Sequence, residues 1–186
     1  SNLKAQVNEL PYSEFRKQLK INYSAHQLSD SPEEIYNAMT EIIESVDSPA
    51  DKQIIPQTYR FFGNLFKKQG NYDFALDLFR KSLKISEAVG FSELTALTFN
   101  DIGNIYYAEG NFERAEENYK EALEIAQGLK NQNALAVTYN NLALIQRARK
   151  NYQKARELHY EALEIRRALN DPYLTGHSYS YIGDLN

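Results

Sequence analysis

The residues of this chain that could do chemistry are its three histidines and its neighbouring carboxylates. None of His26, His159 and His177 belongs to the H-E-x-x-H motif, which places two metal ligands on one helix face. The acidic pair Glu116 and Glu117 lies in a helical pattern, where a solvated face is the simpler interpretation. The sequence has no cysteine, no phosphate-binding glycine loop and no G-x-S-x-G motif. We therefore expect no catalytic residues, no metal, no cofactor and no enzymatic activity.

The composition argues against two classes of binding partner, nucleic acids and membranes. The chain has 186 residues, a net charge of −4 and a pI near 5.5, whereas nucleic-acid-binding domains usually have a basic excess. No apolar run reaches membrane-spanning length, and no signal peptide is recognisable at the start. We expect no direct nucleic-acid binding and no membrane insertion of this segment. A cytoplasmic location is favoured, with an extracytoplasmic sensor segment as the alternative.

The elements that must position any site are helices. Helical periodicity runs along the whole chain, and no strictly alternating strand pattern is found. The sequence repeats at an interval of 40 residues, with small residues at Gly63, Gly103, Ala143 and Gly183, turn residues at Gly70, Gly110 and Lys150, and alanines at Ala75, Ala115 and Ala155. We predict an all-α fold in which each repeat is a helix, a tight turn and a second helix. The small residues mark the places where the two helices touch, because a larger side chain would hold them apart.

This pattern resembles the tetratricopeptide repeat. In the second repeat it is made by Phe99, Ile102, Gly103, Tyr106, Gly110, Phe112, Ala115, Tyr119 and Ala122. The interval of 40 residues exceeds the usual length of about 34 and is similar to kinesin light chain and to bacterial peptide- and signal-responsive regulators. The resemblance implies a right-handed α-solenoid of antiparallel helix pairs. His159 departs from the pattern by occupying a core aromatic position, and we interpret it as a packed structural residue.

We expect a single solenoid over residues 1–186. It would comprise a degenerate N-terminal helix pair (11–55), three repeats (56–95, 96–135 and 136–175) and the start of a truncated fourth repeat (176–186). In the N-terminal pair, Ser31 and Glu34 form a capping box around Pro32, and the apolar face is made by Ile35, Met39, Ile42 and Ile43. The unfinished fourth repeat predicts that more chain follows in the full-length protein.

The resemblance also implies a groove, because first helices line the concave, peptide-binding surface of tetratricopeptide arrays. The corresponding positions are Gln57, Arg60, Asn64, Lys67, Asn100, Asn104, Tyr107, Asn140, Asn141, Leu144, Arg147 and His177. An exposed row of asparagines can pair with a peptide backbone through both donor and acceptor atoms. The other interpretation is that asparagine is merely tolerated there, but it is a poor helix former, so we favour binding. The cations Arg60, Lys67 and Arg147 would suit an acidic peptide.

We therefore predict a module that binds a protein or peptide and forms the interaction or sensing region of a larger regulatory or signalling protein. One alternative is a structural scaffold that self-associates. Another is a regulator similar to the peptide-controlled response-regulator phosphatases, which would be catalytic. The partner's identity and the oligomeric state stay open.

The small positions yield a first prediction. Replacing Ala115 with leucine should overpack the contact between the two helices of the second repeat and cost roughly 1–3 kcal/mol of unfolding free energy. Urea unfolding of the variant and the parent measures this difference. Equal unfolding midpoints would contradict our interpretation of the small residues.

Overall fold

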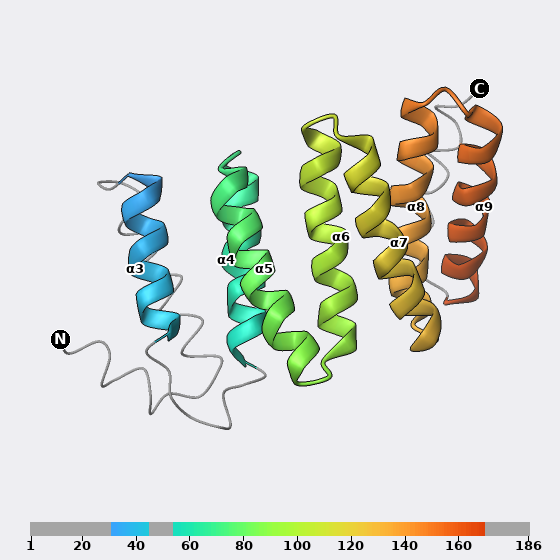
Figure 1. Ribbon diagram of the computed structural model, residues 1–186. Helices are drawn as coiled ribbons and strands as arrows, with labels where there is room; N and C mark the ends of the chain where they lie inside the picture. The colour runs from blue at the N-terminus through green and yellow to red at the C-terminus, as the bar shows by residue number, and fades with distance from the viewer. Residues whose placement is uncertain (1–30, 45–53, 170–186) are drawn as a thin grey trace. The chain divides into compact units, whose positions relative to one another are not determined.

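The computed structural model describes residues 31–44 and 54–169, and every regular element in these ranges is an α-helix (Figure 1). The chain divides into two compact units, Ser1–Phe91 and Ser92–Asn186. The first unit contains α3 (Pro32–Glu44), α4 (Ile54–Lys68) and α5 (Tyr72–Ala88). The second contains α6 (Ser92–Ala108), α7 (Phe112–Gly128), α8 (Gln132–Ala148) and α9 (Tyr152–Ala168). The exact division into repeats stays a prediction.

Helix α3 begins at the predicted capping box. The backbone N–H of Ser31 donates to Glu34 Oε2 at 2.7 Å, and the N–H of Glu34 donates to Ser31 Oγ at 3.3 Å. These two reciprocal bonds confirm the box. The apolar face is also confirmed for the described side chains, since Ile35, Met39 and Ile43 are buried. The side chain of Ile42 and the rest of the predicted N-terminal pair lie outside the described residues.

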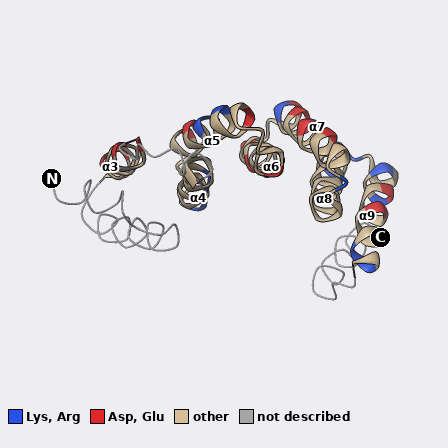
Figure 2. Cartoon of the chain, turned by 90° about the horizontal axis from the view of Figure 1, so that it is seen from below, with Lys and Arg blue, Asp and Glu red and all other residues tan. Residues whose placement is uncertain are grey.

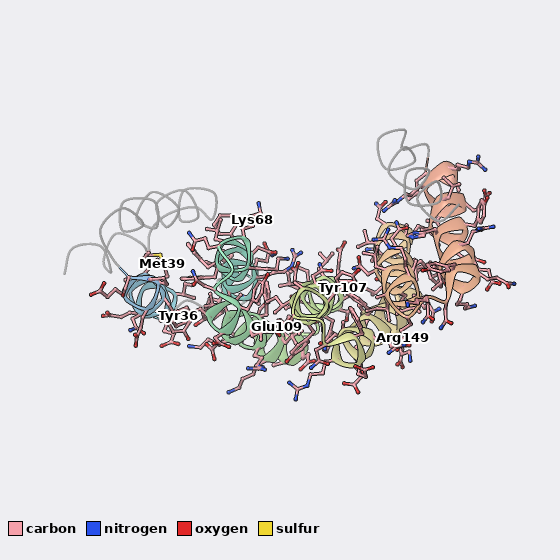
Figure 3. All side chains as sticks on the ribbon, turned by 90° about the horizontal axis from the view of Figure 1, so that it is seen from above. Tyr36, Met39, Lys68, Tyr107, Glu109 and Arg149 are labelled. Carbon is pink, nitrogen blue, oxygen red and sulfur yellow. The ribbon has the colours of Figure 1, made fainter. Side chains whose placement is uncertain are left out.

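A polar and aromatic cluster joins α3 to the pair formed by α4 and α5. The ring of Tyr36, which Figure 3 labels, stacks on Phe74 with centroids 4.9 Å apart. The Tyr36 hydroxyl donates to Asp77. Lys81 on α5 forms an ion pair with Glu44 at 2.8 Å. Because these contacts come from the solvent-facing edge of α3 while its apolar face is buried, the helix is fixed in rotation as well as in position.

In the α4–α5 and α6–α7 pairs, an aromatic ring of the second helix packs on a glycine of the first helix. A Cβ on Gly63 would lie 2.5 Å from the Phe79 ring, and a Cβ on Gly103 would lie at the same distance from the Tyr119 ring. Such distances are shorter than real contacts allow, so only glycine fits opposite a six-membered ring. In the third repeat, the positions of this glycine and ring are taken in the sequence by Ala143 and His159, and both are completely buried. The larger residue on the first helix is thus accompanied by a smaller ring on the second.

The second unit consists of two such pairs, α6 with α7 and α8 with α9. An apolar cluster between α7 and α8 joins them; its buried members are Ala126, Ala134 and Leu135, with Leu123, Tyr139 and Ile165 packed around it. Helices α6 and α8 also contact each other directly. The first helices are therefore covered on several sides, and only a narrow strip of each reaches solvent.

Left-handed residues end the helices, as expected for Gly70 (φ 79°) and Gly110 (φ 76°). Lys130 (φ 52°) and Lys150 (φ 63°) take the same conformation without being glycine. At Lys150 the turn keeps its hydrogen bonds, since the next residue's N–H donates to the carbonyl of Gln146 at 2.8 Å. The turn is therefore specified by the helices around it, and the lysines are held in a strained backbone conformation.

An asparagine directly after the turn glycine is a typical N-cap, which predicts that Asn71 and Asn111 cap the second helices of their repeats, and only the cap at Asn111 is confirmed. Asn111 Oδ1 accepts from the backbone N–H of Arg114 at 3.2 Å, which caps α7. Asn71 makes no such bond to α5, so the expectation of a side-chain cap there is wrong; its Nδ2 donates instead to Gln69 Oε1 at 3.4 Å. The turn glycine and the helix contacts suffice to start α5 without the cap.

The strained turn yields a second prediction. Lys150→Gly should raise the unfolding free energy by about 1 kcal/mol, because glycine adopts φ 63° without a Cβ penalty. Lys154→Gly, inside α9, is the matched control and should lower it by about 1 kcal/mol. Denaturant unfolding monitored by circular dichroism separates the two. Destabilisation by both variants would show that Lys150 is not strained.

Candidate functional site

The predicted groove residues of the first unit lie on α4, where Gln57, Arg60, Asn64 and Lys67 are all half-buried. Asn64 Nδ2 donates to the backbone carbonyl of Arg60 at 3.1 Å, within its own helix. The ammonium of Lys67 lies 5.8 Å from the centroid of the Phe79 ring. Asn64 and Lys67 therefore already have local contacts, the first within α4 and the second with a ring on α5.

Two predicted groove asparagines in the second unit are not on an open surface. Asn100 and Asn140 are only 4% and 6% exposed, so the expectation that they belong to an exposed row of asparagines is wrong. Asn100 Nδ2 donates to Thr138 Oγ1 at 3.0 Å and to the carbonyl of Ala96 at 3.2 Å. The physical reason is that α6 and α8 pack closely, and a polar side chain between them must find partners.

Asn141 is oriented by Asn100. Its Nδ2 donates to Asn100 Oδ1 at 2.9 Å. Because the amide nitrogen of Asn100 already faces the Ala96 carbonyl, which can only accept, its oxygen must be the atom that faces Asn141. Asn141 therefore turns its amide nitrogen inward, and its own Oδ1 is the atom left to reach solvent from this half-buried side chain.

Asn104 has the opposite orientation. The hydroxyl of Tyr119 donates to Asn104 Oδ1 at 2.8 Å. Burial raises the pKa of this hydroxyl well above its ordinary value, and the negative charge of Asp101 adds to the shift, so the proton stays on Tyr119. The Nδ2 of Asn104 has no acceptor among the described residues. Asn104 thus presents a donor and Asn141 an acceptor.

The remaining predicted residues of the second unit, Tyr107, Leu144 and Arg147, are half-buried, and Figure 3 labels Tyr107 on α6. Val137 was not among the predicted residues, yet it is 37% exposed. The spacing could have identified it, because Val137 is an apolar residue four positions before Asn141 and therefore lies on the same helix face. We define the α6–α8 surface as Asn104, Tyr107, Val137, Asn141, Leu144 and Arg147. His177 lies outside the described residues.

Charge is distributed unequally between the two kinds of helix (Figure 2). Helix α7 has seven charged residues, whereas α8 has Arg147 alone. Helix α6 has Glu93 and Asp101, so the expected basic inner surface is not found in this unit. Among the first helices, a basic excess is found only on α4, which has Arg60, Lys67 and Lys68. The α6–α8 surface is therefore mainly amide and apolar.

Of the acidic pair on α7, Glu116 has a structural role and does not lie on a fully solvated face. Arg149, labelled in Figure 3, forms an ion pair with Glu116 and lies 3.6 Å from Glu113. Lys120 lies 2.9 Å from Glu116 within α7. Burial opposes ionisation of Glu116, but hydrogen bonds from Lys120 and Arg149 outweigh it and lower the pKa of the carboxyl. These ion pairs connect α7 to the end of α8. Glu117 is exposed, which agrees with a solvated face.

His159 is a core residue, as interpreted from the sequence. It is completely buried, and its Nδ1 donates to Asn140 Oδ1 at 2.8 Å. Burial, together with the positive charges of Arg147 and Arg166, lowers its pKa to about 4. His159 is therefore neutral near pH 7. Across the described ranges, no group of three or more histidine or carboxylate side chains could hold a metal ion, and no helix has the length and apolarity to cross a membrane.

The repeated pairs, their small-residue contacts and the surface on the first helices define a class of helical-repeat interaction proteins. The sequence matches the tetratricopeptide repeat family over residues 55–128 and 134–186, and the chain belongs to this family. The fold predicted from the sequence, an α-solenoid of antiparallel helix pairs, is confirmed. Tetratricopeptide repeats are generally a non-catalytic fold for protein interaction. A comparison with curated protein sequences gave no significant match.

Several solved structures are similar to this chain. BtubC (BKLC) from P. vanneervenii is 25% identical, with a TM-score of 0.74 over 94% of this chain and 72% of that one. A signal transduction ATPase with numerous domains and a tetratricopeptide repeat sensor, from Pyrococcus horikoshii, is 22% identical, with a TM-score of 0.74 over 97% of this chain and 28% of that one. The apo form of RapI is 18% identical, with a TM-score of 0.71 over 94% of this chain and 45% of that one. The chain thus spans less than half of the latter two.

The buried histidine yields a third prediction. In the folded state the pKa of His159 is about 4, below the ordinary 6.5, so the unfolded state binds the extra proton between these values. This contribution to stability is complete above pH 6.5 and is lost as the pH falls towards 4. Between pH 7 and pH 5, we expect it to remove about 2 kcal/mol of unfolding free energy.

The matched variant is His159→Gln, which cannot titrate. Its unfolding free energy, measured in urea at both pH values, should fall less than that of the parent by this amount, because the carboxylates are the same in both proteins. An equal pH slope in the two proteins would rule out His159 as the titrating group.

Proposed function

We propose that the chain is a peptide- or protein-binding region of a larger regulatory protein, and that the α6–α8 surface is its binding face. A single observation carries the proposal. Solvated helix faces are usually charged, as on α7, whereas the exposed strip of α8 has apolar and amide residues and one arginine. Exposed aliphatic residues next to oriented polar groups are typical of interaction surfaces.

The chemistry of this face suits a particular kind of peptide. Val137 and Leu144 lie seven residues apart on α8, two helical turns on one face, and offer an apolar strip. Arg147 adds the one positive charge on this helix. A peptide with an aliphatic side chain and an acidic side chain or free carboxylate complements both, which retains the acidic partner expected from the sequence.

The two alternative functions, a self-associating scaffold and a phosphatase-like regulator, are supported by different observations. Exposed aromatic residues on α9, Tyr152 at 50% and Tyr160 at 48%, would suit a scaffold that self-associates through that helix. The similarity to RapI and to aspartyl phosphate phosphatase F from Bacillus subtilis, 18% and 20% identical, concerns the fold alone. It gives no residue that would make this chain a phosphatase regulator. Light scattering over a concentration series separates the scaffold from a monomeric binding module.

The proposal is tested with octapeptides recovered from a displayed random library by binding to this chain. Fluorescence anisotropy gives the Kd of one such N-acetylated, labelled octapeptide. Val137→Glu should weaken binding about tenfold, since it puts a carboxylate into the apolar strip and repels an acidic peptide. Arg147→Glu should also weaken it, and more strongly at low salt.

Leu129→Glu is the matched control, because Leu129 is similarly exposed, at 46%, but lies at the end of α7. It should change the Kd less than twofold, and all variants should unfold within the range expected for surface substitutions. Equal weakening by the Val137 and Leu129 variants would show that the peptide does not bind at the α6–α8 surface.

A further inference from the structure

The two asparagines of the α6–α8 surface differ in the atom that they present. Asn104 has its oxygen fixed by the Tyr119 hydroxyl, and Asn141 has its nitrogen fixed by Asn100 Oδ1. A donor on α6 and an acceptor on α8 therefore remain for a ligand. Asn104 lies one helical turn beyond Asn100, the residue that Asn141 contacts, so both amides flank the same contact between the two helices.

We infer that Asn104 and Asn141 bind the two backbone groups of one residue of an extended peptide and so fix the direction in which the peptide runs. This inference rests on the proposed peptide-binding function. In an extended chain, the N–H and the C=O of one residue point to the same side. The peptide N–H donates to Asn141 Oδ1, and the peptide C=O accepts from Asn104 Nδ2.

The direction follows from the order of these groups. Within a residue the N–H precedes the C=O, so the N-terminal part of the peptide lies towards α8 and its C-terminal part towards α6. The ligand therefore runs opposite to the order of the helices in the chain. Reversing it would set a peptide donor against the amide of Asn104 and a peptide acceptor against the oxygen of Asn141, leaving both unpaired.

The other repeats provide internal comparisons. At the position of Tyr119 the first repeat has Phe79, which lacks the hydroxyl, and there the corresponding Asn64 turns its Nδ2 to its own helix. In the third repeat, Leu144 replaces the asparagine. The donor is therefore oriented outward where tyrosine and asparagine occur together. Tyr119 and Asn100 act as positioning residues, since they reach the ligand only through another side chain.

The test uses the acetylated octapeptide of the preceding section, synthesised with single ester bonds along its backbone. An ester at residue n replaces that N–H by oxygen, and an ester at the next residue weakens the carbonyl of residue n as an acceptor. On the parent protein, we expect the first ester to raise the Kd about tenfold and the second about threefold.

Double-mutant cycles then assign each bond. On the Asn141→Ala variant, the ester at residue n should cause no further loss of affinity. The ester at the next residue should still weaken binding as much as it does on the parent protein. On Asn104→Asp, the second ester should lose its effect, because a carboxylate cannot donate. The aspartate keeps the oxygen that accepts from Tyr119, so the unfolding midpoint should stay close to that of the parent. A second variant, Asn104→Leu, adds no charge and introduces the residue that the third repeat has at this position.

Tyr119→Phe tests the positioning residue. The freed amide of Asn104 can turn, so the effect of the second ester should fall by at least half while that of the first ester is unchanged. A purely structural role would weaken the parent peptide and both esters equally.

Several outcomes overturn the inference. The reverse assignment, with the first ester coupled to Asn104, would give the opposite direction, and the absence of coupling would exclude backbone recognition by these amides. If neither amide is coupled to an ester but Val137→Glu still weakens peptide binding, the proposed function stands and only this inference is wrong. A library that yields no binding octapeptide overturns both.

Discussion

The close approach of two helices at a residue without a side chain is the constraint on which this fold depends. Opposite Gly63 and Gly103, an aromatic ring occupies the space that a Cβ would need. This contact sets how closely the two helices approach in these two pairs, because the ring fits there only where the opposite residue has no Cβ. Dispersion contacts and burial of the ring then compensate for the low helix propensity of glycine. In the third repeat both positions change together, to Ala143 and His159, a larger residue on one helix and a smaller ring on the other.

A second constraint acts between first helices. Asn100 lies between α6 and α8 with its hydrogen-bonding groups used, and buried amides with satisfied bonds specify one register far more strictly than apolar contacts do. The surface asparagines gain their orientation from this buried layer. Recognition and packing are thus connected: the amides that reach solvent are held by amides and hydroxyls that do not.

Much of the fold could be predicted because its determinants are local or strictly periodic. Small residues at intervals of 40, the capping box at Ser31 and the core position of His159 each follow from spacing alone. The burial of Asn100 could not be predicted in this way, because it depends on Thr138 and Asn141, which lie on another helix of the next repeat. Helix propensity identified the asparagines as unusual but could not distinguish a buried partner from a bound peptide. Val137 was missed because an aliphatic residue in a helical pattern indicates a core position by default.

Tyr119 combines two roles in separate atoms. Its ring fills the space opposite Gly103, and its hydroxyl oxygen alone orients Asn104. Phenylalanine at this position, as in the first repeat, fulfils the first role completely and the second not at all. On the proposed binding face, the hydrogen-bonding group that a repeat presents can therefore change during evolution by gain or loss of a single oxygen atom, while the ring keeps its packing role.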